Sequence, residues 1–325
     1  MKPTFLYWNF RALIAWVLAL LAIAGFASSN PDFLQPGNLY ALLQIFSPLV
    51  LVACGLGVVM LAGEFDISIS GTFPLVALVS VKLSDSVGTP LAVLIAIALG
   101  IGFGLLNGWV TARFRIPSLA VTVGSMVLAI GIGYAIAGGQ IVQMSDFDSG
   151  MALTQAVGGI FSLQSLIQLV LAALIILTLR ATWLGRYVYA AGSDANRARA
   201  SGMPVSFTVI AAFAISGLAV GLAGALQGVS LASGTAGPDD ALLLQAATAA
   251  ILGGISLNGG KGSLVGVVGA ALLLAVLSNG LSFMGTTSAT IQLVSGAILL
   301  AVVIVDKPLD RFTRRYIQSS TVSVA

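Results

Sequence analysis

The sequence has few of the residues that polar chemistry requires. Only 8% of its 325 residues are charged, histidine is absent, and Cys54 is the only cysteine. These absences exclude disulfides within the chain, zinc sites made from the usual Cys and His ligands, and acid–base catalysis by histidine. We therefore expect no catalytic residue, no metal site and no cofactor bound by this chain.

A nucleotide-binding loop is also missing. The stretch GGISLNGGKGS places Lys261 among glycines, but a phosphate-binding P-loop needs glycine six positions before the lysine and serine or threonine directly after it. Ile255 and Gly262 stand at those positions. We expect that the chain does not itself hydrolyse ATP.

The sequence is instead rich in long apolar runs. Hydrophobic residues make up 58% of the chain and the mean hydropathy is +1.06, so most of it must face lipid or other apolar helices. A membrane-spanning helix needs about 20 apolar residues, and about ten such runs occur, at 11–27, 40–62, 69–82, 90–112, 118–138, 163–180, 206–229, 242–257, 263–283 and 289–305. They predict an all-α polytopic membrane protein with one domain over residues 1–325, whose first run is a retained span rather than a signal peptide.

The charged residues predict the orientation of these spans. With the N-terminus inside, Lys82 is the only one of the 14 Lys and Arg residues that falls outside an inner segment. The predicted outer loops hold acids instead: Asp32, Asp85, Asp146, Asp148, Asp239 and Asp240. Because cytoplasmic loops of membrane proteins are rich in Lys and Arg, we expect both termini inside. Basic residues at the ends of spans also argue against nucleic-acid binding.

Polar residues near the third run suggest a gate or a lining of a pathway. That run is short and follows GEFDISISG, which predicts a broken or re-entrant hairpin near residues 63–70. Acids close to a membrane usually face a cavity or a partner charge, although the same side chains could cap a helix start. Polar residues within other spans could equally form ordinary interhelical hydrogen bonds, and they predict no dense polar cluster. The pathway or gate candidates are Glu64, Asp66, Ser68, Ser70, Asn107 and Asn279.

Residues 184–204 concentrate charge in this otherwise apolar chain. The stretch LGRYVYAAGSDANRARASG predicts a short helix over Ser193–Ser201, with Ser193 or Asp194 as N-cap and Gly202 as its stop. A basic inner loop could simply lie on anionic lipid heads. A short capped helix with both signs of charge favours a docking element for a soluble protein.

Glycines recur at helical spacing in several spans. The sets are Gly100, Gly104 and Gly108; Gly217 with Gly221; Gly224 with Gly228; and Gly262 with Gly266. Glycine at i and i+4 lets two helix backbones approach closely, so we expect these sets to mark helix–helix contacts.

Four motifs together resemble a known family. The stretches GEFDIS, LLNGWVTARFRIPSLAVTVGS, LGRYVYAAGSDANRARASGM and ILGGISLNGGKGSLVGVVGAALLLAVLSNGL occur in this order and lie within roughly residues 31–306. They resemble the membrane-spanning permease subunits of bacterial ABC importers for monosaccharides, a family that includes pentose, hexose and autoinducer-2 permeases.

The resemblance implies an assembly in the bacterial inner membrane. Two permease subunits, identical or paralogous, would form the pathway, a periplasmic binding protein would deliver the sugar, and a cytoplasmic ATPase would bind ATP and Mg²⁺. Residues 184–204 would be the cytoplasmic coupling loop that contacts the ATPase, and residues 306–325 a short cytoplasmic tail. The coupling residues would be Arg186, Gly192, Asp194, Arg197, Arg199 and Gly202.

Two departures from the family pattern leave the solute open. Glu64 replaces a glycine of the usual GGIDLS motif, and LLLQAATA replaces an acidic pattern, with Leu243 and Gln245 where acids would stand. An ion-coupled secondary transporter or channel is the alternative function, but such proteins usually keep ionisable residues within their spans.

Overall fold

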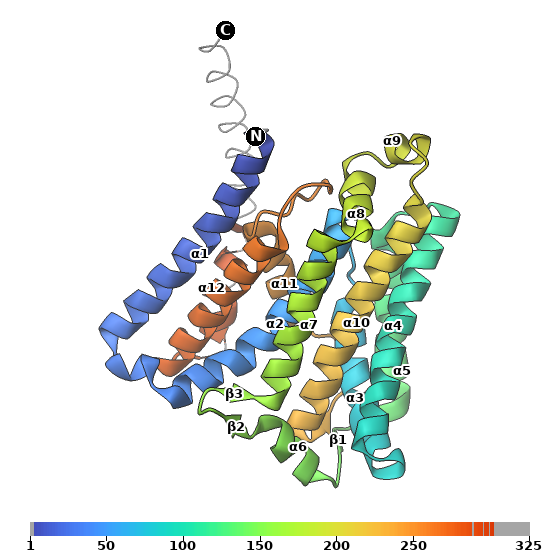
Figure 1. The fold of residues 1–325 in the computed structure, drawn as a ribbon. Coiled ribbons are helices and arrows are strands. Elements are labelled where there is room, and N and C mark those ends of the chain that lie inside the picture. Colours follow the sequence, from blue (N-terminus) through green and yellow to red (C-terminus); the bar gives the residue numbers. More distant parts are fainter. Residues whose placement is uncertain (1–2, 288, 295, 299, 302–325) are drawn as a thin grey trace.

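A bundle of long helices forms most of the protein (Figure 1). The computed structural model describes residues 3–301 except 288, 295 and 299, with side chains from residue 12 onward. The helices are α1 (Pro3–Ser29), η1 (Pro31–Leu34), α2 (Pro36–Leu61), α3 (Ile69–Val87), α4 (Thr89–Phe114), α5 (Ser118–Ala137), α6 (Phe147–Thr154), α7 (Leu163–Ala181), α8 (Trp183–Ser193), α9 (Ala195–Ala200), α10 (Val205–Leu231), α11 (Asp240–Leu252) and α12 (Leu264–Phe283). The predicted tail, residues 306–325, lies outside the described residues.

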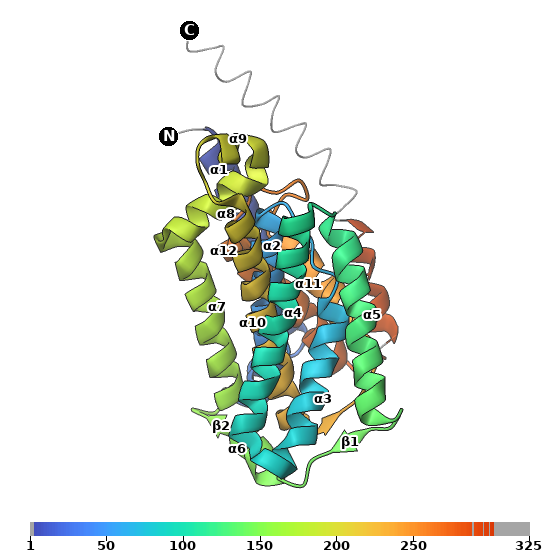
Figure 2. The same ribbon diagram turned by 90° about the vertical axis from the view of Figure 1, so that its right-hand side faces the viewer.

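The bundle has two distinct ends. At one end lie α8, α9 and the loop 253–263, which we call the α9 end (Figures 1 and 2). At the other, the β end, lie α6 and two antiparallel pairs of two-residue strands: β1 (Val142–Gln143) with β4 (Ser233–Gly234), and β2 (Ala156–Val157) with β3 (Phe161–Ser162). These four short strands are a small departure from the predicted all-α fold.

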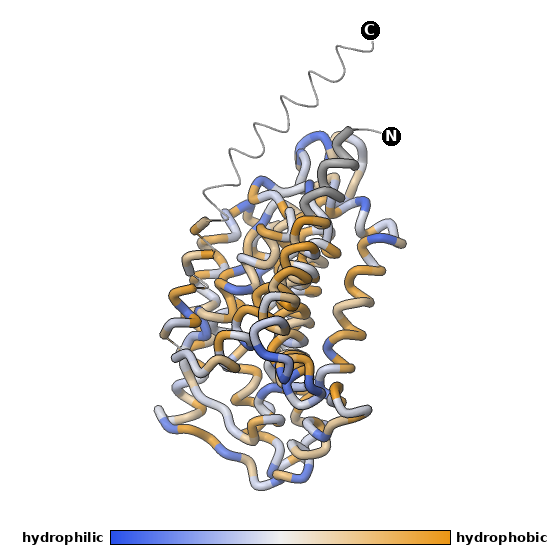
Figure 3. The backbone as a smooth tube through the Cα atoms, turned by 90° about the vertical axis from the view of Figure 1, so that its left-hand side faces the viewer, coloured by the Kyte–Doolittle hydropathy of each residue, from blue (hydrophilic) through white to orange (hydrophobic). Residues whose placement is uncertain are grey.

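Among the residues that the structure describes, seven helices are long and apolar enough to cross a membrane. They are α1, α2, α4, α5, α7, α10 and α12. Helices α3 and α11 match the predicted runs 69–82 and 242–257 but are shorter or less apolar, and the last run lies only partly within the described residues. Hydrophobic segments occupy the middle of the helices and hydrophilic ones gather mainly at the two ends (Figure 3). The fold is therefore that of a polytopic membrane protein.

Two breaks interrupt the helices inside the bundle. The predicted break is present, since α2 ends at Leu61, residues 64–67 have no regular structure, and α3 begins at Ile69. The second break lies between the predicted runs 206–229 and 242–257: after β4, residues 235–239 run without regular structure to the start of α11.

The two breaks meet near the start of α3. The backbone N–H of Asp239 donates to the carbonyl of Ser70 (2.8 Å). Pro74 lacks the N–H that would otherwise reach this carbonyl within the helix, so the carbonyl is free to accept. Asp239 and Asp240, expected in a loop, instead form the start of α11, which this bond ties to the start of α3.

Glycine contacts join the central helices, as their spacing predicts. A Cβ at Gly100 of α4 would lie 2.7 Å from the carbonyl of Gly217 of α10, and one at Gly224 would lie 2.6 Å from the carbonyl of Phe73. Helix α10 thus packs backbone to backbone against both α4 and α3. The set Gly262 and Gly266 is an exception, because Gly262 precedes α12, with φ +135°, and only Gly266 lies within the helix.

Candidate functional site

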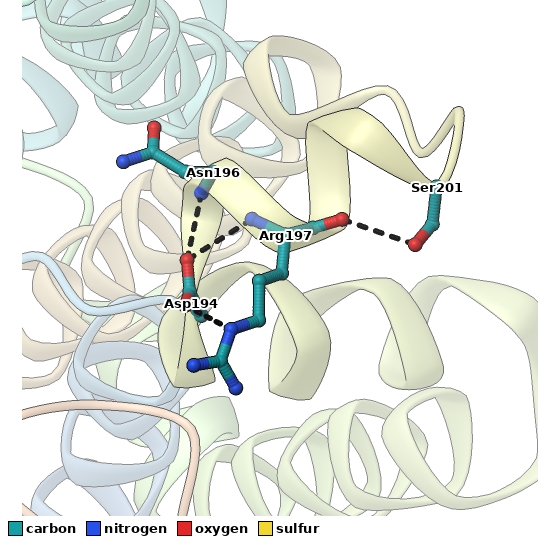
Figure 4. A network of polar contacts seen from close by, with 4 residues as sticks. All are labelled: Asp194, Asn196, Arg197 and Ser201. Carbon is teal, nitrogen blue, oxygen red and sulfur yellow. Dashed lines mark hydrogen bonds and ion pairs between the residues drawn. The ribbon is translucent and has the colours of Figure 1, made fainter.

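Helix α9 is short, exposed and closed at both ends by its own residues (Figure 4). Asp194 is the N-cap: its Oδ1 accepts from the backbone N–H groups of Asn196 and Arg197, both at 3.0 Å. At the other end Gly202, with φ +78°, lets the N–H of Met203 reach the carbonyl of Ala198 (3.0 Å), which forms a Schellman motif. The predicted cap and stop are confirmed. Residues 183–193, however, form the separate helix α8 rather than a loop.

Three arginines of α8 and α9 lie on the surface of the α9 end. Arg186, Arg197 and Arg199 are exposed, whereas Ala198 is buried against the protein. Arg197 Nε lies 2.9 Å from Asp194 Oδ2, and the Arg197 side chain is 88% exposed. The backbone hydrogen bond from Arg197, more than the arginine charge, lowers the pKa of Asp194. Asp194 therefore acts mainly as a helix cap, and the arginines are available for a partner.

Beneath α9 lies a contact that we call the glycine junction: Gly63, Gly192, Gly259 and Gly260. A Cβ at Gly192 would lie 2.5 Å from the backbone nitrogen of Gly260, and one at Gly259 would lie 2.5 Å from the Cα of Gly63. The N–H of Gly260 donates to the carbonyl of Leu61 (2.9 Å). The end of α8 therefore touches both the segment that follows α2 and the loop 253–263, with no side chain between the backbones.

Further hydrogen bonds hold α8 on the loop 253–263. The hydroxyl of Tyr189 donates to the carbonyl of Gly262 (3.0 Å). The hydroxyl of Ser193, which donates to the carbonyl of Tyr189 (2.8 Å), also lies 3.3 Å from the carbonyl of Gly260. A displacement of α8 and α9 would therefore be transmitted directly to this loop and, through the glycine junction, to the start of the first break.

Three of the predicted pathway residues meet in a buried polar group that we call the Asp66 centre: Asp66, Ser68, Asn107 and Ser216. Asp66 accepts from the hydroxyl of Ser216 on α10 (2.9 Å) and from the backbone N–H and hydroxyl of Ser68. Asn107 on α4 donates to the hydroxyl of Ser68 (2.9 Å). All four side chains are at most 3% exposed.

The Asp66 centre lies well inside the bundle. Ser216 is eleven residues into α10, about 17 Å along the helix axis at about 1.5 Å per residue. The expectation of no dense polar cluster is therefore wrong. The sequence signal that could have found Ser216 was its position beside Gly217 in a small-residue stripe.

The other pathway candidates lie elsewhere. Ser70 donates to Asp240 Oδ1 (2.6 Å), which ties α3 to the start of α11. Asn279 exchanges two hydrogen bonds of 3.1 Å with Asn38 and so joins α12 to α2. Glu64 is half-buried and lines a cavity of about 340 Å³ at the α9 end together with Arg115 and Arg199.

A cluster of amide side chains was not predicted. Gln44 Nε2 donates to the hydroxyl of Ser162 (2.8 Å), and Gln164 Nε2 donates to Gln227 Oε1 (3.2 Å). The hydroxyl of Ser47 donates to Gln168 Oε1 (2.8 Å). These bonds link α2, α7 and α10 in the half of the bundle nearer the β end. Glutamines within apolar runs were the available signal.

Comparison with known proteins connects this architecture to transport. Residues 38–303 match the family model described as the permease component of the branched-chain amino acid transport system. The autoinducer 2 import system permease protein of Yersinia enterocolitica is 32% identical over 81% of this chain and 72% of its own length. No solved structure matches.

Two further relatives come from Escherichia coli K12. The ribose import permease protein is 31% identical over 81% of this chain and 83% of its own length. The L-arabinose transport system permease protein is 32% identical over 82% of this chain and 80% of its own length. With the match over residues 38–303 and the seven apolar helices, these similarities show that the chain belongs to the permease components of ABC import systems, as a multi-pass protein of the bacterial inner membrane.

Proposed function

We propose that this chain forms the translocation pathway of an ATP-driven importer for a sugar or a similar small hydroxylated solute. The observation that carries the proposal is the contact of α8, which leads directly into the exposed, capped helix α9, with the segment after α2 and the loop 253–263 through the glycine junction. The relatives, which import ribose, arabinose or autoinducer 2, support the solute class. The family assignment favours this importer over the ion-coupled alternative.

The α9 end faces the cytoplasm in this proposal. The α9 end holds basic residues, namely Arg113, Arg115, Arg180, Arg186, Arg197, Arg199 and Lys261. The β end holds the acidic residues Asp85, Asp146 and Asp148. This distribution supports both termini inside and ten spans, counting α3, α11 and the last run, by the positive-inside rule.

A cytoplasmic ATPase is the proposed partner of α9. ATP and Mg²⁺ would bind to that subunit, and this chain would have no catalytic role. The ATPase would contact Arg186, Asp194, Arg197 and Arg199, while Gly192 and Gly202 shape the element. A rigid helix with two positions can pass the closure of the ATPase to the glycine junction. A second permease chain, identical or paralogous, and a periplasmic binding protein complete the proposed importer.

Co-purification tests the proposal. The tagged chain is expressed with its native neighbours and extracted in mild detergent, and uptake of labelled D-ribose, L-arabinose and autoinducer 2 is measured in the same cells. We expect a stoichiometric ATPase in the preparation and uptake of at least one of the three solutes. A stable chain without an ATPase would contradict the proposal.

A pair of variants locates the contact. Asn196→Pro removes a capping N–H and restrains Ala195 against the helix, so the ATPase should be lost. Asn196→Ala keeps the N–H and should retain the ATPase. Equal retention by both variants would exclude α9 as the docking helix.

A further inference from the structure

A cavity of about 520 Å³ opens between α2, α3, α10 and the second break. It lies in the half of the bundle nearer the β end, since its walls include Leu231 at the end of α10 and Ser233 of β4. Its volume is in the range of about 300–1,000 Å³ that small-molecule sites occupy. The polar side chains of the wall are Gln44, Gln227, Ser233, Thr235 and Asp239.

Two glutamines offer this cavity complementary amide groups. Gln44 uses its Nε2 on Ser162, which leaves Oε1 as an acceptor, and Gln227 uses its Oε1 on Gln164, which leaves Nε2 as a donor. Each sugar hydroxyl carries one donor and two acceptor positions. The hydrogen bonds to Ser162 and Gln164 orient the two amide groups, so that Oε1 of Gln44 is held as a free acceptor and Nε2 of Gln227 as a free donor.

Two prolines interrupt the intrahelical hydrogen bonds beside this wall. Pro48 of α2 has no N–H to bond the carbonyl of Gln44, four residues earlier in the helix. Both residues line the cavity. The corresponding carbonyl freed by Pro74 is the one that receives the N–H of Asp239. Each of the two prolines therefore removes the usual intrahelical donor of a carbonyl near the cavity.

The charge of the cavity excludes anions. Asp239 is the only charged residue in its wall, and no lysine or arginine occurs among the described residues that line it. Asp239 Oδ1 caps the N–H of Leu242 (3.0 Å), which leaves Oδ2 for a ligand. A sugar phosphate or the carboxylate of an amino acid would meet this carboxylate without a compensating cation.

We infer that this cavity binds a neutral polyhydroxylated solute within a single permease chain, with Gln44, Gln227 and Asp239 as its hydrogen-bonding partners. The inference rests on the proposed import function and extends it, because it assigns the contacting residues and excludes anionic solutes. The solute would then lie on the β-end side of the Asp66 centre. It would reach this cavity before it reaches the segments that contact α8 at the glycine junction.

Cysteine labelling tests the site directly, because Cys54 is the only cysteine and is buried. In a Cys54→Ala background, Thr235→Cys lines the cavity, Gln140→Cys is an exposed residue at the β end, and Leu177→Cys lies on the apolar exterior of α7. Intact cells are treated with a cationic or an anionic methanethiosulfonate that cannot cross the membrane. We expect both reagents to label Gln140→Cys, the cationic reagent to label Thr235→Cys preferentially, and neither to label Leu177→Cys.

A further substitution tests whether the charge of Asp239 causes this preference. Adding Asp239→Asn, which retains a capping oxygen, should abolish the cationic preference at Thr235→Cys.

Protection by solutes tests the ligand class. Whichever of D-ribose and L-arabinose the cells import should slow labelling of Thr235→Cys but not of Gln140→Cys, whereas ribose 5-phosphate and leucine should not. Gln44→Leu or Gln227→Leu should raise the half-protecting sugar concentration about tenfold, as expected for one lost hydrogen bond of about 1.4 kcal/mol. Gln155→Leu, which alters an exposed glutamine outside this cavity, is the control and should leave that concentration unchanged.

The outcomes separate this inference from the proposed function. Each variant must co-purify with the ATPase as the parent does, which shows that it has folded. If the cells import sugar but Thr235→Cys is unreactive, or reacts without protection by the imported sugar, the cavity is not the solute site. If the parent chain imports no sugar and binds no ATPase, the proposed function itself fails.

Discussion

In α9, the bonds that hold the helix join residues at most five positions apart, such as Asp194 to Arg197 and Ala198 to Met203. The Asp66 centre instead joins the first break to α4 and α10, and its bond between Asp66 and Ser216 spans 150 residues. The first region is exposed and keeps its shape by local capping, and the second exists only when three segments have packed. This difference fits the proposed roles of the two regions. A docking helix such as α9 must move as a rigid unit, whereas the first break must keep one conformation until α8 and α9 are displaced.

The glycine junction links these two regions, and breaking it should have the largest effect. Gly192→Val would put side-chain atoms where the backbones of Leu61 and Gly260 already lie, so transport should be abolished. Gly124→Val adds the same side chain where nothing lies within 4 Å and should retain transport. Solute uptake, normalised to the amount of chain in the membrane, is the measurement. Active Gly192→Val would show that α8 does not act through this contact.

Removing the carboxylate of the Asp66 centre should be the next most damaging change. Asp66→Ala leaves the hydroxyl of Ser216 and the N–H of Ser68 without an acceptor, which should lower the free energy of unfolding by about 1–3 kcal/mol. Asp66→Asn keeps one acceptor oxygen and should cost less. Thermal unfolding of the purified complex measures both. Equal stability of the two variants would mean that the carboxylate does not organise the break.

Loss of the cap should weaken α9 without unfolding the bundle. Asp194→Ala removes the acceptor of two backbone N–H groups, and uptake should fall by roughly several-fold. Asp194→Asn should restore most of it, since asparagine also caps helices. Uptake of both variants equal to that of the parent would show that α9 does not depend on its cap.

The same cap predicts a pH dependence. The pKa of Asp194 is lowered in the folded chain, chiefly by the hydrogen bond from the Arg197 backbone. A lowered folded pKa means that the stabilisation is complete above the unfolded value of about 3.9 and is lost only as pH falls through the folded value. ATPase co-purification should therefore be independent of pH from about 5 to 8. A midpoint near neutral pH that disappears in Asp194→Asn would contradict this assignment.

Single charge losses on α9 should have the smallest effect. Arg197→Ala removes an exposed ion pair, and such pairs contribute about 0–1 kcal/mol. Transport should fall by less than about fivefold, and Arg199→Ala should behave similarly. If Arg197→Ala abolished transport while Asn196→Pro did not, individual charges rather than the helix would make the contact.

The sequence alone determined the features that depend on neighbouring residues. Apolar runs of sufficient length predict spans because the bilayer requires them, and Asp194 and Gly202 predict the ends of α9 because caps act within a few positions. The glycine sets of α4 and α10 predicted a close helix contact, although not its partner.

Only the tertiary structure decided where the polar groups meet. Ser216 and Asp66 are far apart in sequence, and nothing local in either stretch indicates the other. The second break and the cavity it lines depend on a carbonyl that Pro74 frees for a residue more than 160 positions away. Local chemistry fixes a helix and its ends, but the pairing of buried donors and acceptors follows from packing, because an unpaired polar group inside the bundle costs too much to remain.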